Sequence, residues 1–375
     1  RPMTDTQTAP LKRRWLVALW GLATVPFLTR LAIGRTSYDI ELYWTGGSAV
    51  LQGAKLYTDV VFAYPPYALI WFVGPAAIAA NLAQFRLAFG LLIWAIDAGV
   101  KGVLLGQAAR AGSRLRDLAP FVMYVLATAA LGHLLLQRYD VIPAALSLAA
   151  LLALVRGWPG TAGALVAIAA GAKVYPALFV PVMAIYAWRR SRRGLIRFLT
   201  GVLIASLPLV LAAWWMPWWR FATFQANRGL QVESAWASIV WMLHFAGVPA
   251  RWEVVTAWHE VTGPVAAWLV GPSRAVWIAA IGASLARAAW VAWRLPWSTA
   301  DAGRERTRAA WLSSLALLML LPVTSFVAFS PVLSPQFHLW LLPWCALALA
   351  APDPPGFDPR PARRAVWCIL FSTLI

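Results

Sequence analysis

Apolar residues fill most of this chain in long runs, and short clusters of arginine separate many of these runs. A run of about 20 apolar residues is long enough, as a helix, to cross a hydrocarbon core about 30 Å thick. Helices are the expected element because each one satisfies its own backbone hydrogen bonds in lipid. The pattern therefore predicts an all-α, polytopic integral membrane protein with about ten or more transmembrane helices.

The apolar stretch at 66–83 is treated separately, because Gly74 and Pro75 are expected to break a helix there. Without it, an even number of crossings separates each neighbouring pair of basic clusters, as the positive-inside rule requires. We therefore interpret 66–83 as a segment that dips into, or lies on, the outer leaflet. The basic clusters are at 12–14, 110–116, 189–197, 294–308 and 360–364. The predicted spans are 15–33, 87–109, 118–136, 141–155, 160–174, 176–188, 196–214, 264–293, 308–329 and 339–351, and another begins at 365.

This topology gives a cytoplasmic tail at 1–14 and a single transmembrane domain at 15–375, with large outer loops at 34–65 and 215–263. The first apolar run is longer than the core of a signal peptide and lacks a clear cleavage site, so it is predicted to be a span. Because the sequence ends inside an apolar run, we expect the natural protein to continue beyond it.

Composition supports membrane residence, since 61% of the residues are hydrophobic and 12% are charged. A net charge of +18 would suit nucleic acid, but the basic residues lie in clusters between apolar runs, so no nucleic-acid partner is predicted. Cys345 and Cys368 lie in apolar runs and are expected to be buried thiols. No Walker loop, GxSxG elbow, HExxH or Cys/His cluster occurs, which argues against an ATPase, a serine hydrolase or a zinc enzyme.

Candidate chemistry begins in the first outer loop. Asp39 and Glu41 lie two positions apart just after the first span, close to Tyr43. A carboxylate that is partly desolvated beside aromatic rings can act as a general base, whereas the alternative is a solvated anion or a helix N-cap. Tyr64 lies in a bent, ring-rich segment that suits an amphipathic substrate, or else serves only as an interfacial anchor.

Cations on the same predicted face are candidates for binding a phosphate. Lys173 lies in an apolar span just before Tyr175, and such a lysine costs about 2.5 to 3.5 kcal/mol, so it indicates function unless it snorkels to the interface. Arg138 and Asp140 lie between two spans and form either a local ion pair or a substrate site. Arg228, in the second outer loop, offers the planar fork of donors that clamps a phosphate.

Three further polar residues of the outer face complete the candidates. Glu233 lies in the second outer loop, and Gln336 and His338 stand where the last complete span opens, so that both a structural and a binding role stay open. Asp97 and Lys101 are four residues apart within one span, which places them on the same helix face. We interpret this last pair as structural.

Taken in order, these pieces resemble the C-type (GT-C) glycosyltransferases, and most closely glycosyltransferase family 87, the polyprenol-phosphate-mannose-dependent mannosyltransferases. The resemblance covers about residues 15 to 350. It implies a GT-C-like fold in the bacterial plasma membrane, with the active site on the extracytoplasmic side. The matching segments are Asp39 with Tyr43, Tyr64-Pro65-Pro66, Arg138-Tyr139-Asp140, Lys173-Val174-Tyr175-Pro176 and Ser334-Pro335-Gln336.

The resemblance also implies the reaction. The donor would be a polyprenyl-phosphate-linked sugar, with mannose as the family's sugar, and the acceptor a hydroxyl of a glycolipid or glycan, with no cofactor and no indicated divalent metal. Asp39 would be the base of an inverting displacement, although Glu41 departs from a single-acid pattern and stays a candidate. The donor phosphate would be bound by Lys173, Arg228, Arg138 and His338, and the substrates by Tyr43, Tyr64, Asp140, Tyr175, Glu233 and Gln336.

Two other function classes stay open. A secondary transporter or flippase of lipid-linked sugars would keep its charges near the bilayer midplane and show internal repeats. No repeat is seen here, and the charges gather at the outer ends of spans. A non-catalytic assembly subunit would tolerate substitution of Asp39 and Lys173.

Overall fold

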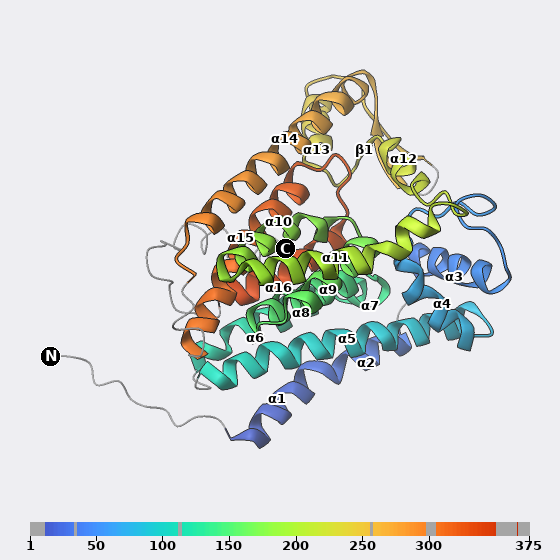
Figure 1. The fold of residues 1–375 in the computed structure, drawn as a ribbon. Coiled ribbons are helices and arrows are strands. Elements are labelled where there is room, and N and C mark those ends of the chain that lie inside the picture. The colour runs from blue at the N-terminus through green and yellow to red at the C-terminus, as the bar shows by residue number, and fades with distance from the viewer. Residues whose placement is uncertain are drawn as a thin grey trace.

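The fold is mostly helical (Figure 1), as the apolar runs predict. The computed structural model describes residues 12–33, 36–111, 115–255, 258–297, 305–349 and 366. Most of the predicted tail at 1–14, the predicted last span and Cys368 lie outside these residues. The helices are α1 (Arg13–Thr24), α2 (Pro26–Ile33), α3 (Tyr38–Leu51), α4 (Ala68–Ile78), α5 (Leu82–Ala111), α6 (Leu115–Leu131), α7 (His133–Gln137), α8 (Val141–Val155), α9 (Pro159–Ala172), the 3₁₀ helix η1 (Tyr175–Phe179), α10 (Val180–Arg190), α11 (Arg192–Ala212), α12 (Arg220–Ala226), α13 (Ala235–Phe245), α14 (Pro264–Arg294), α15 (Glu305–Phe329), the 3₁₀ helix η2 (Pro335–Phe337) and α16 (His338–Leu349).

Four helices of the described chain are long and apolar enough to cross a membrane: Leu82–Arg110, Arg192–Ala212, Pro264–Arg294 and Arg308–Phe329. Other apolar helices are shorter. Helices α8 and α9 have 15 and 14 residues, or roughly 21 to 23 Å at 1.5 Å per residue, less than the thickness of a hydrocarbon core. A membrane protein is thus supported, while the count of about ten or more spans stays a prediction.

Three of the predicted spans are interrupted. The first is divided at Val25, because Pro26 has no N–H to continue the hydrogen bonds of α1. The span at 118–136 is divided at Gly132, whose φ of 59° favours glycine. The span at 160–174 ends early, so that Lys173 lies at the C-cap of α9 in an extended conformation and not inside a helix.

The first predicted outer loop contains a helix, α3, that begins directly at the candidate acids. The expected helix break at Gly74 and Pro75 is also wrong, because α4 continues through both residues to Ile78. A single proline removes only one hydrogen bond, and α4 packs so closely on α3 that a Cβ at Gly47 would lie 2.7 Å from the Phe72 carbonyl oxygen. This packing holds the helix together across the proline.

The second predicted outer loop contains a small sheet, so the chain is not purely α-helical. Strands β1 (Leu230–Gln231), β2 (Arg251–Val255) and β3 (Trp258–Thr262) form an antiparallel sheet in the order β1-β3-β2. The last two are rich in valine, threonine and tryptophan, which favour strands. Leu230 of β1 and Val261 of β3 form a second, small core with α13 and the start of α14, whereas the side chains of β2 are exposed.

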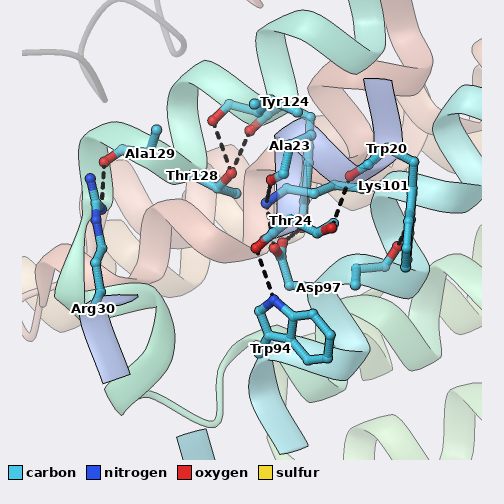
Figure 2. Close-up of polar contacts among 12 residues, drawn as sticks. Trp20, Ala23, Thr24, Arg30, Trp94, Asp97, Lys101, Tyr124, Thr128 and Ala129 are labelled. Atoms are coloured by element: carbon cyan, nitrogen blue, oxygen red, sulfur yellow. Dashed lines mark hydrogen bonds and ion pairs between the residues drawn. The ribbon is translucent and has the colours of Figure 1, made fainter. Parts of the chain in front are cut away.

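A buried ion pair on α5 links this helix to α1 and α6 (Figure 2). Lys101 Nζ lies 2.6 Å from Asp97 Oδ2 and donates to the Ala23 carbonyl, while the Tyr124 hydroxyl donates to Asp97 Oδ1. Trp94 Nε1 donates to the Thr24 carbonyl at 2.9 Å. Lys101 and Trp94 of α5 therefore donate hydrogen bonds to carbonyl groups just before the interruption at Pro26. These contacts agree with the structural role predicted for Asp97 and Lys101.

Candidate active site

The candidate site is built where the ends of several helices meet. Helix α12 is attached to the segment between α3 and α4, since Arg220 donates to the Tyr57 carbonyl and Gln225 Nε2 donates to the Ala63 carbonyl, both at 3.0 Å. Tyr67 N donates to the Gly171 carbonyl at 3.0 Å, which links that segment to the end of α9. The two predicted outer loops are thereby joined at one end of the molecule (Figure 1).

Asp39 lies at the start of α3 and is held by two side chains. Arg138, from the turn between α7 and α8, forms an ion pair with Asp39, and the Tyr64 hydroxyl lies 3.3 Å from Asp39 Oδ1. The carboxylate remains about one-fifth exposed. Glu41 is exposed two residues further along α3. The structure therefore separates the two candidate acids.

Asp140 pairs with Lys173, and not with Arg138 as a local ion pair would. Lys173 Nζ lies 2.5 Å from Asp140 Oδ1, and Trp340 Nε1 of α16 donates to the same oxygen at 2.6 Å. The Asp140 side chain is only 1% exposed. A carboxylate this deeply buried requires such partners, because an unpaired charge would cost several kcal/mol.

Aromatic rings surround both ion pairs. Tyr43 stacks on Phe72 at 4.3 Å and meets Tyr139 edge to face at 5.6 Å. Tyr175 stacks on Trp340 at 4.3 Å. The Lys173 ammonium also lies 4.8 Å from the Tyr139 ring and 5.0 Å from the Trp340 ring, distances typical of cation–π contacts. Tyr43 and Tyr175 thus belong to the aromatic rings packed beside the two ion pairs.

Arg228 is positioned by the sheet and by α12. Its guanidinium donates to Gln225 Oε1 at 3.2 Å and to Gln231 Oε1 at 2.7 Å, and lies 4.1 Å above the Trp258 ring. On α14, Arg274 donates to the Arg228 carbonyl at 2.6 Å.

Burial and the neighbouring charges both shift the pKa of Arg228. Burial lowers the pKa of Arg228 to about 10, and the nearby charges of Glu260 and Glu233 oppose that shift, so the group remains a cation at neutral pH. Burial likewise lowers the pKa of Lys173, Asp140 opposes the shift, and the positive charges of Arg138 and Arg228 lower it further. Three cations therefore share one electrostatic environment.

The remaining predicted residues have local partners. His338 Nδ1 lies 3.0 Å from the Pro335 carbonyl at the start of α16, and Ser334 Oγ donates to Gln336 Oε1. Glu233 is exposed. In the part of the chain that the structure describes, the side chains of His338, Gln336 and Glu233 form no hydrogen bond or ion pair with the residues of the two ion pairs, although α16 itself supplies Trp340.

Residues 62–331 match the family model described as glycosyltransferase family 87. The chain belongs to glycosyltransferase family 87. Among the curated proteins and the solved structures, none matches significantly. The matched region contains Tyr64, Arg138, Asp140, Lys173 and Arg228, while Asp39 and Glu41 precede it and Gln336 and His338 follow it.

For this family 87 glycosyltransferase, a sugar donor, an acceptor and a lipid bilayer are the implied partners. Several buried polar atoms of the site have no hydrogen-bond partner in the part of the chain that the structure describes: Asp140 Oδ2, the Tyr175 hydroxyl and Arg228 Nε. Buried polar groups are normally paired. These atoms are therefore candidates for contacts with a substrate.

Trp340 and Arg274, which donate to Asp140 and to the Arg228 carbonyl of the candidate site, were not predicted from the sequence. Trp340 carries no signal in the sequence, because tryptophan is common in membrane helices. Arg274 did carry one, since it is a charged residue within the predicted span at 264–293. For metals, no group of three or more His, Cys, Asp or Glu side chains gathers within the described residues.

Proposed function

We propose that this glycosyltransferase transfers a sugar from a polyprenyl-phosphate donor to a hydroxyl of a glycolipid or glycan on the outer face of the bacterial plasma membrane. Mannose is the proposed sugar. The observation that carries the proposal is the pairing of Asp39 with Arg138 beside the pairing of Asp140 with Lys173, with Arg228 in the same electrostatic environment. Such a site offers a base for the acceptor and cations for a phosphate.

Asp39 acts as the general base in the proposed mechanism. Its carboxylate takes the proton of the acceptor hydroxyl as that oxygen attacks the anomeric carbon. The bond from the anomeric carbon to the phosphate oxygen breaks, and its electron pair leaves with the polyprenyl phosphate. A single displacement of this kind inverts the anomeric centre and passes through an oxocarbenium-like state.

The choice of Asp39 over Glu41 rests on their surroundings. Asp39 is held by Arg138 and Tyr64, which fix its orientation, whereas Glu41 is exposed. A base must be held within hydrogen-bond reach of the proton that it removes. The exposed Glu41 side chain, at the fourth position of the helix, lacks that restraint.

The donor phosphate is proposed to enter the site by exchange of partners. Arg138 and Lys173 are both occupied by carboxylates, so a phosphate that binds them takes over these cations. When Arg138 moves to the phosphate, Asp39 is left free to accept a proton. Negative charge that develops on the leaving phosphate is then stabilised by Lys173, Arg138 and Arg228, with His338 at the rim.

The remaining site residues are proposed to bind the sugar or the acceptor. Asp140 Oδ2 and the Tyr175 hydroxyl are buried and have no partner among the described residues, so sugar hydroxyls would satisfy both. Tyr43 and Tyr64 shape the floor beside the base, and Glu233 and Gln336 line the approach. No metal or other cofactor is required in this scheme, because three cations supply the charge that a metal ion would.

Transport of a lipid-linked sugar is the less favoured alternative, because membership of a glycosyltransferase family points to group transfer. To test the proposal, the purified protein is incubated with a panel of polyprenyl-phosphate sugars and candidate acceptors, with and without EDTA, and the glycosylated product is measured. Transfer of sugar, unaffected by EDTA, is expected. Flux of the intact donor across proteoliposomes without any glycosylated product would refute the proposal.

A further inference from the structure

A groove of about 520 Å³ lies between α9 and α11, which pack side by side along the bundle (Figure 1). The groove is separated from the candidate active site along α9. Ala164 is the α9 residue of the groove nearest to Lys173, and it lies nine positions before Lys173, or about 13 Å along the helix axis. The groove is therefore a separate feature from the site described above.

The groove exists because the two helices meet through their backbones. A Cβ built on Gly163 would overlap the Phe198 carbonyl oxygen, and one built on Gly201 would overlap that of Gly160. Contact this close leaves no room for side chains between the helix axes. The small residues Gly160 and Ala164 then leave the outer edge of the contact hollow.

Three polar side chains open into this hollow. Arg197 and Thr200 come from α11, Thr161 comes from α9, and all three are exposed. Within the described part of the chain, no carboxylate forms an ion pair with Arg197. One guanidinium and two hydroxyl groups among the lining residues offer the donors that bind a phosphate.

Along α11, the surface on one side of the groove is apolar and the surface on the other side is basic. Further along α11, Ile204 lines the groove, and Leu203 and Leu207 are exposed beside it, at 70% and 49%. Before it, α10 ends and α11 begins with the basic cluster at 189–197. A cation next to a basic cluster at the end of an exposed apolar helix is the arrangement that anionic lipids recognise.

We propose that this groove binds one anionic phospholipid, from the leaflet that faces the basic cluster. Its phosphate is held by Arg197, Thr161 and Thr200, and the start of one acyl chain lies along Ala164 and Ile204. Charge complementarity favours this occupant over a second copy of the chain, which would leave the Arg197 guanidinium in a helix–helix contact without an anion. A cavity of this volume holds a headgroup and the first part of one chain.

Native mass spectrometry of the full chain, titrated separately with dioleoyl phosphatidylglycerol and dioleoyl phosphatidylcholine, tests the proposal. Three variants are compared. Arg197→Gln removes the cation, Ala164→Leu fills the hollow without touching any charge, and Arg193→Gln removes an exposed arginine of the same cluster that does not line the groove. Thermal unfolding of each variant shows whether it is folded.

One phosphatidylglycerol is expected to bind more tightly than phosphatidylcholine. Its affinity should fall about tenfold or more in Arg197→Gln, because a hydrogen bond to a charged group is lost, and also in Ala164→Leu, but not in Arg193→Gln. Equal losses in Arg193→Gln and Arg197→Gln would overturn the proposal, as would unchanged binding by folded Ala164→Leu. Preferential binding of a polyprenyl phosphate, or a dimer that excludes lipid, would overturn it as well.

Discussion

Arg138 forms its ion pair with Asp39 at the start of α3, although Asp140 is only two residues away in its own turn. Asp140 is instead buried with Lys173 and Trp340. The ion pair between Arg138 and Asp39 therefore connects the candidate base at the start of α3 to the turn before α8. The two ion pairs thus lie side by side in one site.

Replacement of Arg138 by Gln should lower kcat/KM for sugar transfer about 100-fold or more, because the variant loses both the restraint on Asp39 and a cation for the leaving phosphate. Exposed Arg156 at the end of α8 provides the control, since Arg156→Gln leaves the site intact. Transfer rates of the purified variants measure the effect. Wild-type kinetics in Arg138→Gln would contradict the proposed role.

Loss of one partner of the buried pair between Lys173 and Asp140 should destabilise the protein. Removing one charge from such a pair costs about 3 to 5 kcal/mol, because the other is left buried and unpaired. We therefore expect Lys173→Met to lower Tm strongly, and Lys173→Met combined with Asp140→Leu to recover part of the loss. Additive losses in this double-mutant cycle would show that the two groups do not interact in the folded protein.

The pair of Asp97 and Lys101 should affect stability and not chemistry. Lys101→Met leaves Asp97 buried and also removes the donor to the Ala23 carbonyl, so a loss of about 3 to 5 kcal/mol is expected. Transfer activity per folded molecule should remain that of the wild type. A selective loss of activity with an unchanged Tm would contradict this assignment.

The contact between α9 and α11 should tolerate a methyl group at one glycine and not at another. Gly163→Ala places its Cβ against the Phe198 carbonyl oxygen and should cost about 1 to 3 kcal/mol or more, as overpacking does. Gly160→Ala, on the same helix, brings its Cβ only to 3.5 Å from the Arg197 carbonyl oxygen. Thermal unfolding compares them, and equal Tm values would show that the helices are not in backbone contact.

Long apolar runs predicted the helices well, and α8 was placed at 141–155 without error. Such runs are readable because hydrophobic length is a property of the local sequence. Helix α3 was missed because its polar residues look like a loop, and the sheet because its strands are only two and five residues long. The tail, and the span predicted from 365, lie largely outside the described residues.

Several of the predicted site residues lie together in the structure, but their pairing was not predicted. Trp340 donates to Asp140 across 200 positions of the chain, and no local pattern predicts such a contact. The sequence left open whether Arg138 and Asp140 form a local ion pair or a substrate site, and packing of the helices placed a different partner beside each one. The roles of these residues in transfer stay predictions.

The proposed mechanism requires Asp39 as the base, and this requirement is tested by the rate of sugar transfer in the Asp39→Asn variant. Asparagine keeps the size of the side chain and its acceptor for the Tyr64 hydroxyl but cannot take a proton. With radiolabelled polyprenyl-phosphate mannose as donor, we expect folded Asp39→Asn to lose roughly 100- to 10,000-fold in rate, in line with the contribution of a general base, and Glu41→Gln to remain near the wild type. Wild-type transfer by Asp39→Asn, or loss of transfer in Glu41→Gln alone, would show that Asp39 is not the base.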